Sequence, residues 1–151
     1  MIKNIYDKQV VEEILVRLEK LTPSTPQLWG KMNSSQMLAH LNVAYEMVYE
    51  SNHKKPNFLL RFVLKNFVKK KIIDDSVYSK NGPTSPAFII NSEKNFDVEK
   101  ARLIAYLNKT QELGSTFFEN KENLNFGVLT SEGWNNMFYK HIDHHFSQFD
   151  I

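Results

Sequence analysis

Hydrophobic residues recur at spacings of three and four along most of the chain, which is the period of an amphipathic α-helix. Residues 7–21 show the pattern clearly, because Lys and Glu separate their apolar positions. Five segments follow this period, over residues 7–21, 33–51, 58–71, 96–113 and 131–149. The pattern therefore predicts four main helices and one shorter helix, which is the third of the five.

Residues with helix-capping side chains stand at the starts of three of these segments. Asn33 precedes the second predicted helix and Gln36 follows three residues later, so the two side chains can form a capping box. Asp97 is the expected cap of the fourth helix, and either Thr130 or Ser131 is expected to cap the last one. These residues set the predicted helix boundaries.

The connections between the predicted helices are rich in Pro, Gly and small polar residues. Gly114 is expected to end the fourth helix. Residues 74–95 form the longest connection, and residues 88–91 within it are the only strand-like piece. We therefore expect an all-α protein with a single domain over residues 1–151, built as a four-helix bundle with a short extra helix and a long middle crossover.

The composition narrows the range of functions. The chain has 151 residues, a formal net charge of +2 and no cysteine. A small net charge gives no support for a nucleic-acid or membrane partner. The lack of cysteine excludes disulfides, thiolate metal ligands and a cysteine nucleophile. The N-terminal segment has no apolar stretch of the kind found in signal peptides, so we expect a soluble, cytoplasmic protein.

The short predicted helix over residues 58–71 is basic, and it leaves one alternative open for the partner of the protein. Its aromatic residues alternate with five cations, which are Arg61, Lys65, Lys69, Lys70 and Lys71. This pattern occurs in helices that grip a nucleic acid or lie on an anionic membrane surface. It is also the ordinary pattern of an amphipathic helix with one solvated face. We therefore expect neither a nucleic acid nor a membrane as a partner.

Three of the five histidines lie within five consecutive residues near the end of the chain. His141 and His145 are four residues apart, so a helix would project both imidazoles toward a common point. His40 lies in the middle of the apolar stripe of the second predicted helix. Because helix bundles build metal sites from facing helices, these three residues are the candidate ligands of one divalent ion.

Three neutral imidazoles leave a coordination position open for water or substrate, as in catalytic metal sites. Zinc is the commonest metal in such open sites, and nickel, iron(II) and copper also accept imidazole. His144 is rotated around the helix from His141, so it can replace His145 as a ligand or lie at the edge of the site. We expect the second role. His53 is expected to be a solvated cation near a helix end.

Other residues on the same face of the last helix are expected to form the surroundings of the site, and these are Trp134, Phe138 and Gln148. Two functions suit this arrangement. One is a metal-dependent enzyme in which the ion activates a nucleophile. The other is a non-enzymatic binding protein in which a pocket between the helices takes a small ligand. Loss of His141 would abolish metal uptake in the first case and leave ligand affinity largely intact in the second.

Several short motifs carry a family resemblance. They are WGKM at Trp29–Met32, QMLAHL at Gln36–Leu41, FGxLT at Phe126–Thr130 followed by Trp134, and KHxxHHxxQF at Lys140–Phe149. With these motifs the chain resembles an uncharacterised branch of the DinB/YfiT-like superfamily of metal-dependent helical-bundle proteins. That branch commonly has a proline where this chain has Asn125, which affects only the expected conformation of the loop.

The resemblance implies a four-helix bundle of up-down-down-up topology. It also implies a divalent metal held by His40, His141 and His145. Characterised members of the superfamily look like enzymes that transfer, or act with, a low-molecular-weight thiol such as bacillithiol. We therefore expect a transferase or hydrolase with a small-molecule substrate. The high aromatic content would allow some Phe side chains to pack between two subunits, so a homodimer is one assembly that the sequence leaves open.

Overall fold

A computed structural model describes all 151 residues of the chain, which folds mainly into helices with one small two-stranded sheet. The expected helical class is thus confirmed, while the absence of strands is not. The elements in chain order are α1 (Lys8–Glu19), α2 (Ser34–Tyr49), α3 (Phe58–Val63), the π-helix η1 (Leu64–Val68), α4 (Lys69–Ile73), the 3-10 helix η2 (Pro86–Phe88), α5 (Phe96–Phe118), β1 (Lys121–Asn123), β2 (Gly127–Leu129) and α6 (Ser131–Gln148).

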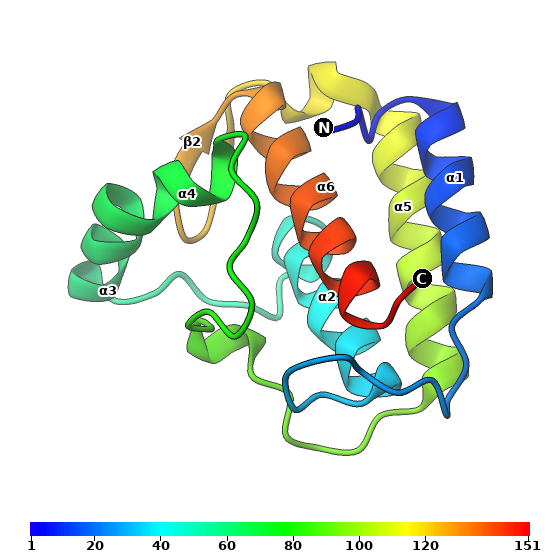
Figure 1. The fold of residues 1–151 in the computed structure, drawn as a ribbon. Coiled ribbons are helices and arrows are strands. Elements are labelled where there is room, and N and C mark those ends of the chain that lie inside the picture. The colour runs from blue at the N-terminus through cyan, green and yellow to red at the C-terminus, as the bar shows by residue number, and fades with distance from the viewer.

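The four long helices lie side by side and enclose the hydrophobic core (Figure 1). Helix α5 packs against α1, α2 and α6, and α2 also contacts α6. Fully buried side chains from all four helices fill the space between them, among them Ile14, Leu41, Leu107 and Phe146. The apolar stripes predicted from the sequence therefore face one common core.

The helix boundaries follow local cap chemistry, with two corrections. The expected capping box forms, because the Asn33 side chain accepts the amide of Gln36 while the Gln36 side chain accepts the amide of Asn33. Helix α5 is capped by Asn95 and not by Asp97, since an Asn side chain two residues earlier reaches the free amide first. Gly114 does not end the helix, but at φ 66° it makes a kink from which a further helical turn continues.

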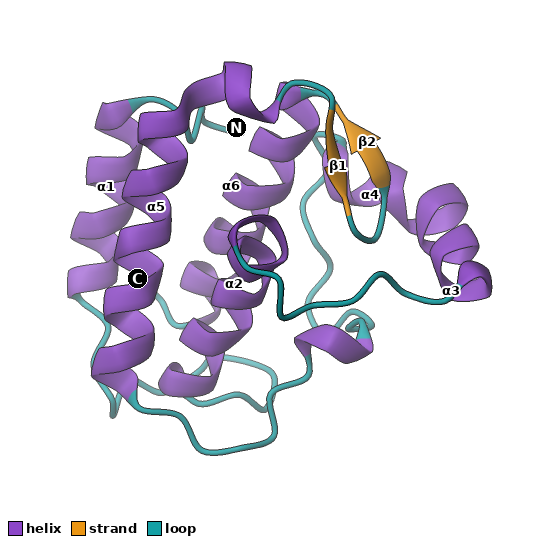
Figure 2. Cartoon of the chain, turned by 180° about the vertical axis from the view of Figure 1, so that it is seen from behind, coloured by secondary structure: helices purple, strands orange, loops and turns teal.

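A β-hairpin joins α5 to α6, where the sequence pattern indicated only a loop. Its two strands pair antiparallel, with Lys121 opposite Leu129 (Figure 2). The strands have three residues each, which is too short for an alternating pattern to be visible in the sequence. The Asn123 side chain accepts the amides of Asn125 and Phe126 and so closes the turn. The strand-like residues 88–91 form no strand, because η2 begins at Pro86.

Residues 58–73 form an arm of α3, η1 and α4 that projects away from the long helices (Figure 1). Its C-terminal end, next to α6, is anchored by Lys140 of that helix, a buried ammonium that donates to the carbonyl oxygens of Lys71 and Asp74 at 2.9 and 2.6 Å. Residues 74–95 then cross back to α5 as a long connection that contains η2, and η2 contacts α2. The arm and this connection together wall off a space beside α2 and α6. No helix has the length and apolar character needed to cross a membrane.

Candidate metal centre

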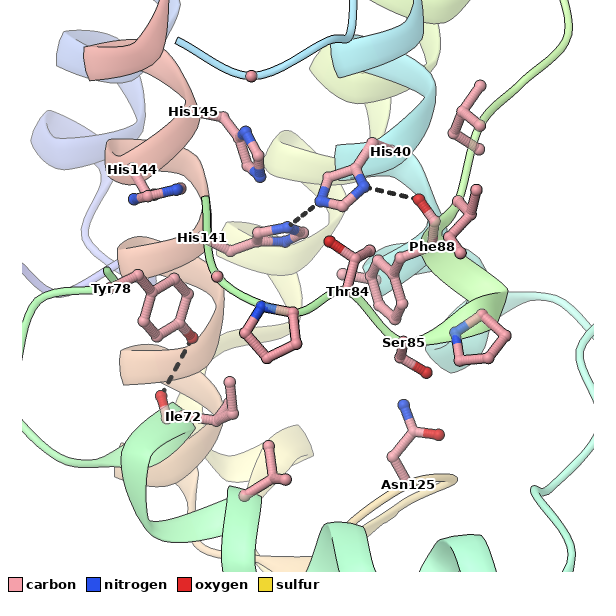
Figure 3. Close-up of a pocket in the computed structure, with 18 of the residues that line it drawn as sticks. His40, Ile72, Tyr78, Thr84, Ser85, Phe88, Asn125, His141, His144 and His145 are labelled. Carbon is pink, nitrogen blue, oxygen red and sulfur yellow. Dashed lines mark hydrogen bonds between the residues drawn. The ribbon is translucent and has the colours of Figure 1, made fainter. Parts of the chain in front are cut away.

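The three predicted ligands meet between α2 and α6. His40 comes from α2, and His141 and His145 come from successive turns of α6. The ring centroid of His40 lies 4.8 Å from that of His141 and 4.5 Å from that of His145, and the latter two are 5.0 Å apart. One nitrogen from each ring can be chosen so that all three lie within 4.8 Å of one another. Figure 3 shows the three rings pointing toward one another. These three histidines can hold a metal ion.

The backbone of η2 sets the tautomer of His40. Its Nδ1 lies 2.8 Å from the carbonyl oxygen of Phe88, and a carbonyl oxygen only accepts hydrogen bonds. Nδ1 of His40 is therefore the protonated nitrogen. In the neutral ring the lone pair then lies on Nε2, which faces His141 (Figure 3). A carbonyl partner of this kind is a common way to orient an imidazole ligand.

A chain of two hydrogen bonds sets the tautomer of His145. The Gln148 amide nitrogen donates to the carbonyl oxygen of Trp29 at 2.6 Å, so the amide oxygen of Gln148 must face His145. That oxygen accepts from Nδ1 of His145 at 2.8 Å. The lone pair of neutral His145 consequently lies on Nε2. Two ligands thus have the Nε2 lone pair set by hydrogen bonds that lead to backbone carbonyls of distant segments, directly to Phe88 for His40 and through Gln148 to Trp29 for His145.

The contacts of Gly30 show why the WGKM motif has a glycine at this position. A Cβ at this position would lie 2.5 Å from the amide nitrogen of Gln148, and the backbone there has φ 81°. Only glycine combines that conformation with that close approach. The loop before α2 is therefore shaped to let Gln148 reach the Trp29 carbonyl.

The third ring completes the cluster through a close nitrogen–nitrogen contact. Nε2 of His141 lies 2.8 Å from Nε2 of His40. Since the latter carries a lone pair, His141 donates its Nε2 proton across this contact in the metal-free protein. A tetrahedral zinc site with Zn–N bonds of about 2.0–2.1 Å spaces its nitrogens by about 3.3 Å. The span of 2.8 to 4.8 Å brackets that spacing, so the separation of the three rings is compatible with one shared ion.

The surroundings keep all three imidazoles neutral. Burial, together with repulsion from the neighbouring ring of His40, lowers the pKa of His145 to about 3. Burial also holds the pKa of His141 well below 6.5, with repulsion from the adjacent imidazoles adding to the effect. The pKa of His40 is lowered by burial, although its bond to the Phe88 carbonyl opposes this. Neutral rings are the form that binds a metal.

A cavity of about 970 Å³ opens onto the three rings. The arm, the long connection and the turn of the hairpin form its walls, so a ligand inside it would touch segments far apart in the sequence. Figure 3 shows Tyr78, Thr84, Ser85 and Asn125 around this space. Its size suits a small organic ligand.

The remaining predicted site residues fall in two places. His144 lines the cavity beside His145, with ring centroids 5.0 Å apart, and contacts Trp29 and Tyr78, while it does not belong to the ligand cluster. Burial lowers its pKa. Gln148 also lines the cavity.

Trp134 and Phe138 were expected beside the pocket but do not line it. Both are buried in the core, where Trp134 packs on Phe118 and Phe138 stacks on Tyr45. The reason is that they face Tyr45 and Phe118 of the core, whereas Met137 and the histidines line the cavity from another side of α6. His53 also differs from the expectation of a solvated cation, because its Nε2 lies 2.6 Å from a carboxylate oxygen of Glu46.

Sequence reasoning missed the groups that orient the ligands and form the cavity wall. The Phe88 and Trp29 partners are backbone carbonyls, which any residue type carries, so no side-chain pattern could have revealed them. Tyr78 lies in the irregular connection, and its hydroxyl donates to the Ile72 carbonyl at 3.2 Å. The WGKM and KHxxHHxxQF motifs were the available signal, because Gln148 links them physically.

The family of the chain follows from comparison with known proteins. Residues 6–150 match the family described as "Protein of unknown function (DUF1569)". The chain belongs to this family. The matched region includes α2 and α6, which carry the three clustered histidines. No curated protein and no solved structure matches the chain.

Proposed function

We propose that this DUF1569 protein is a metal-dependent enzyme in which His40, His141 and His145 hold one divalent ion. When bound, such an ion acts as a Lewis acid that activates a water molecule or a small thiol. The observation that carries the proposal is the orientation of the ligands. Partners from the η2 backbone and from the Gln148 amide leave the Nε2 lone pairs of His40 and His145 facing one centre.

The cavity supports a catalytic site over a purely structural one. Structural zinc sites are closed by four protein ligands, whereas only three histidines form this cluster. The open side faces the cavity, whose walls would orient a small-molecule substrate and limit the access of bulk water. His144 lies at the edge of the cluster and offers a further polar contact to such a substrate.

We further propose that zinc is the ion and that the protein is a four-helix bundle of the DinB/YfiT-like type. Zinc fits three neutral imidazoles with an open position, and nickel or iron(II) would occupy the same ligands. The side-by-side packing of α1, α2, α5 and α6, with a crossover between α2 and α5, supports the bundle assignment. By the same resemblance, the reaction is a thiol transfer or a hydrolysis.

Metal titration tests the proposal. The protein is dialysed against a chelator, then titrated with zinc, nickel or iron(II), with binding followed by calorimetry and thermal melting. At a free zinc concentration of 100 times Kd we expect a gain in unfolding free energy of about 2.7 kcal/mol. His40→Ala, His141→Ala and His145→Ala should each remove this gain.

His144→Ala is the matched control, because it removes a neighbouring imidazole from the same helix without touching the ligand set. It should retain metal binding. Absence of stabilisation by all three metals would refute the proposal, as would an equal loss in the His144→Ala variant.

A ligand-binding protein without catalysis is the second candidate, and the size of the cavity favours it. The His141→Ala variant separates the two functions. It should lose metal and activity together if the first function holds, and keep its affinity for a cavity ligand if the second does.

A further inference from the structure

The cavity has an unusual charge balance for a place that receives a cation. None of the residues that line it is Asp or Glu. Lys31 and Lys71 are part of the lining, and the Lys80 ammonium lies 4.2 Å from the ring centroid of Trp29, which also belongs to the wall. Asp143, the acidic residue between the metal-binding histidines of α6, pairs with Arg17 at 2.7 Å and does not line the cavity.

The cavity lining offers no negative charge to balance a cation bound at the proposed metal site. Three neutral imidazoles leave both positive charges of the ion uncompensated, and a partly buried charge without a counter-charge is costly. Zinc sites with a carboxylate ligand meet part of this need from the protein itself. Here the negative charge has to come from the molecule that enters the cavity.

Much of the remaining cavity wall is apolar. It is formed by side chains of the arm, with further contacts from η2 and the residues after it, and its members include Leu60, Leu64, Val68, Ile72, Phe88 and Ile90. Apolar surface of this extent favours a ligand with a hydrocarbon or aromatic body. The histidine cluster and this apolar surface therefore suit different ends of one molecule.

We infer that the cavity binds a small amphipathic anion, with its negative head group toward the histidine cluster and its apolar body against the apolar side chains of the arm. This inference rests on the proposed metal site. A carboxylate and a thiolate satisfy the same requirement, since each brings one negative charge and an atom that can bind a divalent ion.

Cobalt(II) in place of zinc provides a test with a spectroscopic signal. The cobalt-loaded protein is titrated with octanoate, octanamide and octylamine, and the visible cobalt bands and the heat of binding are recorded. Octanoate should bind at least tenfold more tightly than octanamide and should change the cobalt bands, while octylamine should not bind. Octanoate should also bind more tightly than acetate, because acetate lacks the apolar body.

The failures of the two proposals can be distinguished. If no cobalt bands develop, the metal site itself is wrong. If the bands develop but octanoate and octanamide bind equally, the metal site stands and the anion inference is overturned. Lys71→Met should weaken octanoate binding relative to Lys70→Met, a matched variant at an exposed lysine that does not line the cavity. Equal affinities of these two variants would also count against the inference.

The outer face of the arm is apolar and does not take part in the cavity. Its large apolar side chains are exposed to solvent, with Phe58 at 85%, Leu59 at 72% and Phe62 at 51% of full exposure. Val63, at 40% of full exposure, extends this patch along the arm. The arm stands apart from the long helices, so no other part of the chain covers it (Figure 2). Exposed aromatic patches of this kind mark interaction sites.

The charge around this patch is positive. Residues 51–73 contain seven Lys and Arg residues and no Asp or Glu. Arg61 and Lys55 pair with Glu122 of the hairpin, whereas Lys54, Lys65 and Lys70 are exposed. In a symmetric dimer both copies would bring the same positive charge to the interface, which is unfavourable. An anionic surface would complement them.

We propose that the outer face of the arm lies on an anionic lipid surface, with Phe58 and Phe62 in the headgroup region and the lysines near the lipid phosphates. Aromatic insertion combined with lysine attraction is the usual physics of interfacial helices. This proposal replaces the expectation that the protein has no membrane partner. It does not depend on the metal site.

Vesicle co-sedimentation of the full chain tests it. Binding should be strong to vesicles that contain phosphatidylglycerol, weak to pure phosphatidylcholine, and reduced by high salt. Phe58→Ser/Phe62→Ser should abolish binding. The matched control Val16→Ser/Leu28→Ser changes exposed apolar residues elsewhere and should leave binding intact.

Equal binding to both kinds of vesicle would overturn the proposal. So would a homodimer, measured by light scattering, that is lost in the Phe58→Ser/Phe62→Ser variant, since the patch would then be a protein interface.

Discussion

Acidification should destabilise the metal-free protein through its buried histidines. An imidazole whose pKa is lowered by folding binds a proton more readily in the unfolded chain. Such an imidazole therefore has no effect on the free energy of unfolding above its pKa in the unfolded chain, about 6.5. Below that pH, stability is lost progressively until the pH reaches the pKa in the folded protein. His145 is the clearest case, because burial lowers its pKa from 6.5 to about 3.

The magnitude follows from the interval over which this residue is protonated only in the unfolded chain. Between pH 6.5 and pH 5 that interval is about 1.5 pH units, which at about 1.36 kcal/mol per unit corresponds to about 2 kcal/mol. The lowered pKa values of His40 and His141 act in the same direction. A loss of this size is substantial for a domain whose total stability is about 5–15 kcal/mol.

Urea unfolding of the chelator-treated protein at pH 7 and pH 5 measures the effect. The parent chain should lose about 2 kcal/mol more between these pH values than His145→Gln, which lacks the titrating group. Equal losses in the two proteins would refute the reasoning, because they would mean that His145 is not held neutral by the fold. The chelator is essential, since bound metal would add its own pH dependence.

Two further predictions test which residues act on the metal site and which belong only to the core. Gln148→Leu removes the amide that orients His145, so zinc affinity measured by calorimetry should fall about 10- to 100-fold. Gly30→Ala should lower it in the same direction by displacing that amide, and unchanged affinity in both variants would contradict the assigned role. Trp134→Ala should cost about 3–5 kcal/mol in urea unfolding while zinc affinity is kept, and a marked loss of affinity would place Trp134 at the site after all.

The lowered pKa values also refine the expected pH dependence of metal binding. Free histidine would lose metal as the pH falls through about 6.5. In the folded protein the imidazoles of the cluster stay neutral to lower pH, so protons compete less with the ion. Metal affinity measured on the native protein should therefore begin to fall only at a pH lower than 6.5.

The sequence by itself determined the features that depend on residues close together in the chain. The helical period predicted the long helices, and it placed His141 and His145 on one face because they are four residues apart. The Asn33 and Gln36 pair predicted the start of α2, since a capping box involves only neighbouring groups. The choice of His40 depended on its position within an apolar stripe, which indicates the side of the helix that turns inward.

Tertiary structure alone decided the features that depend on distant segments. It brought His40 within 2.8 Å of His141, and it placed the Phe88 and Trp29 carbonyls where they orient two of the rings. It also assigned Trp134 to the core and left Phe58 exposed, although both belong to helical apolar patterns. The physical reason is that periodicity reports which side of a helix is apolar, whereas the partner that covers this side is set by packing between helices.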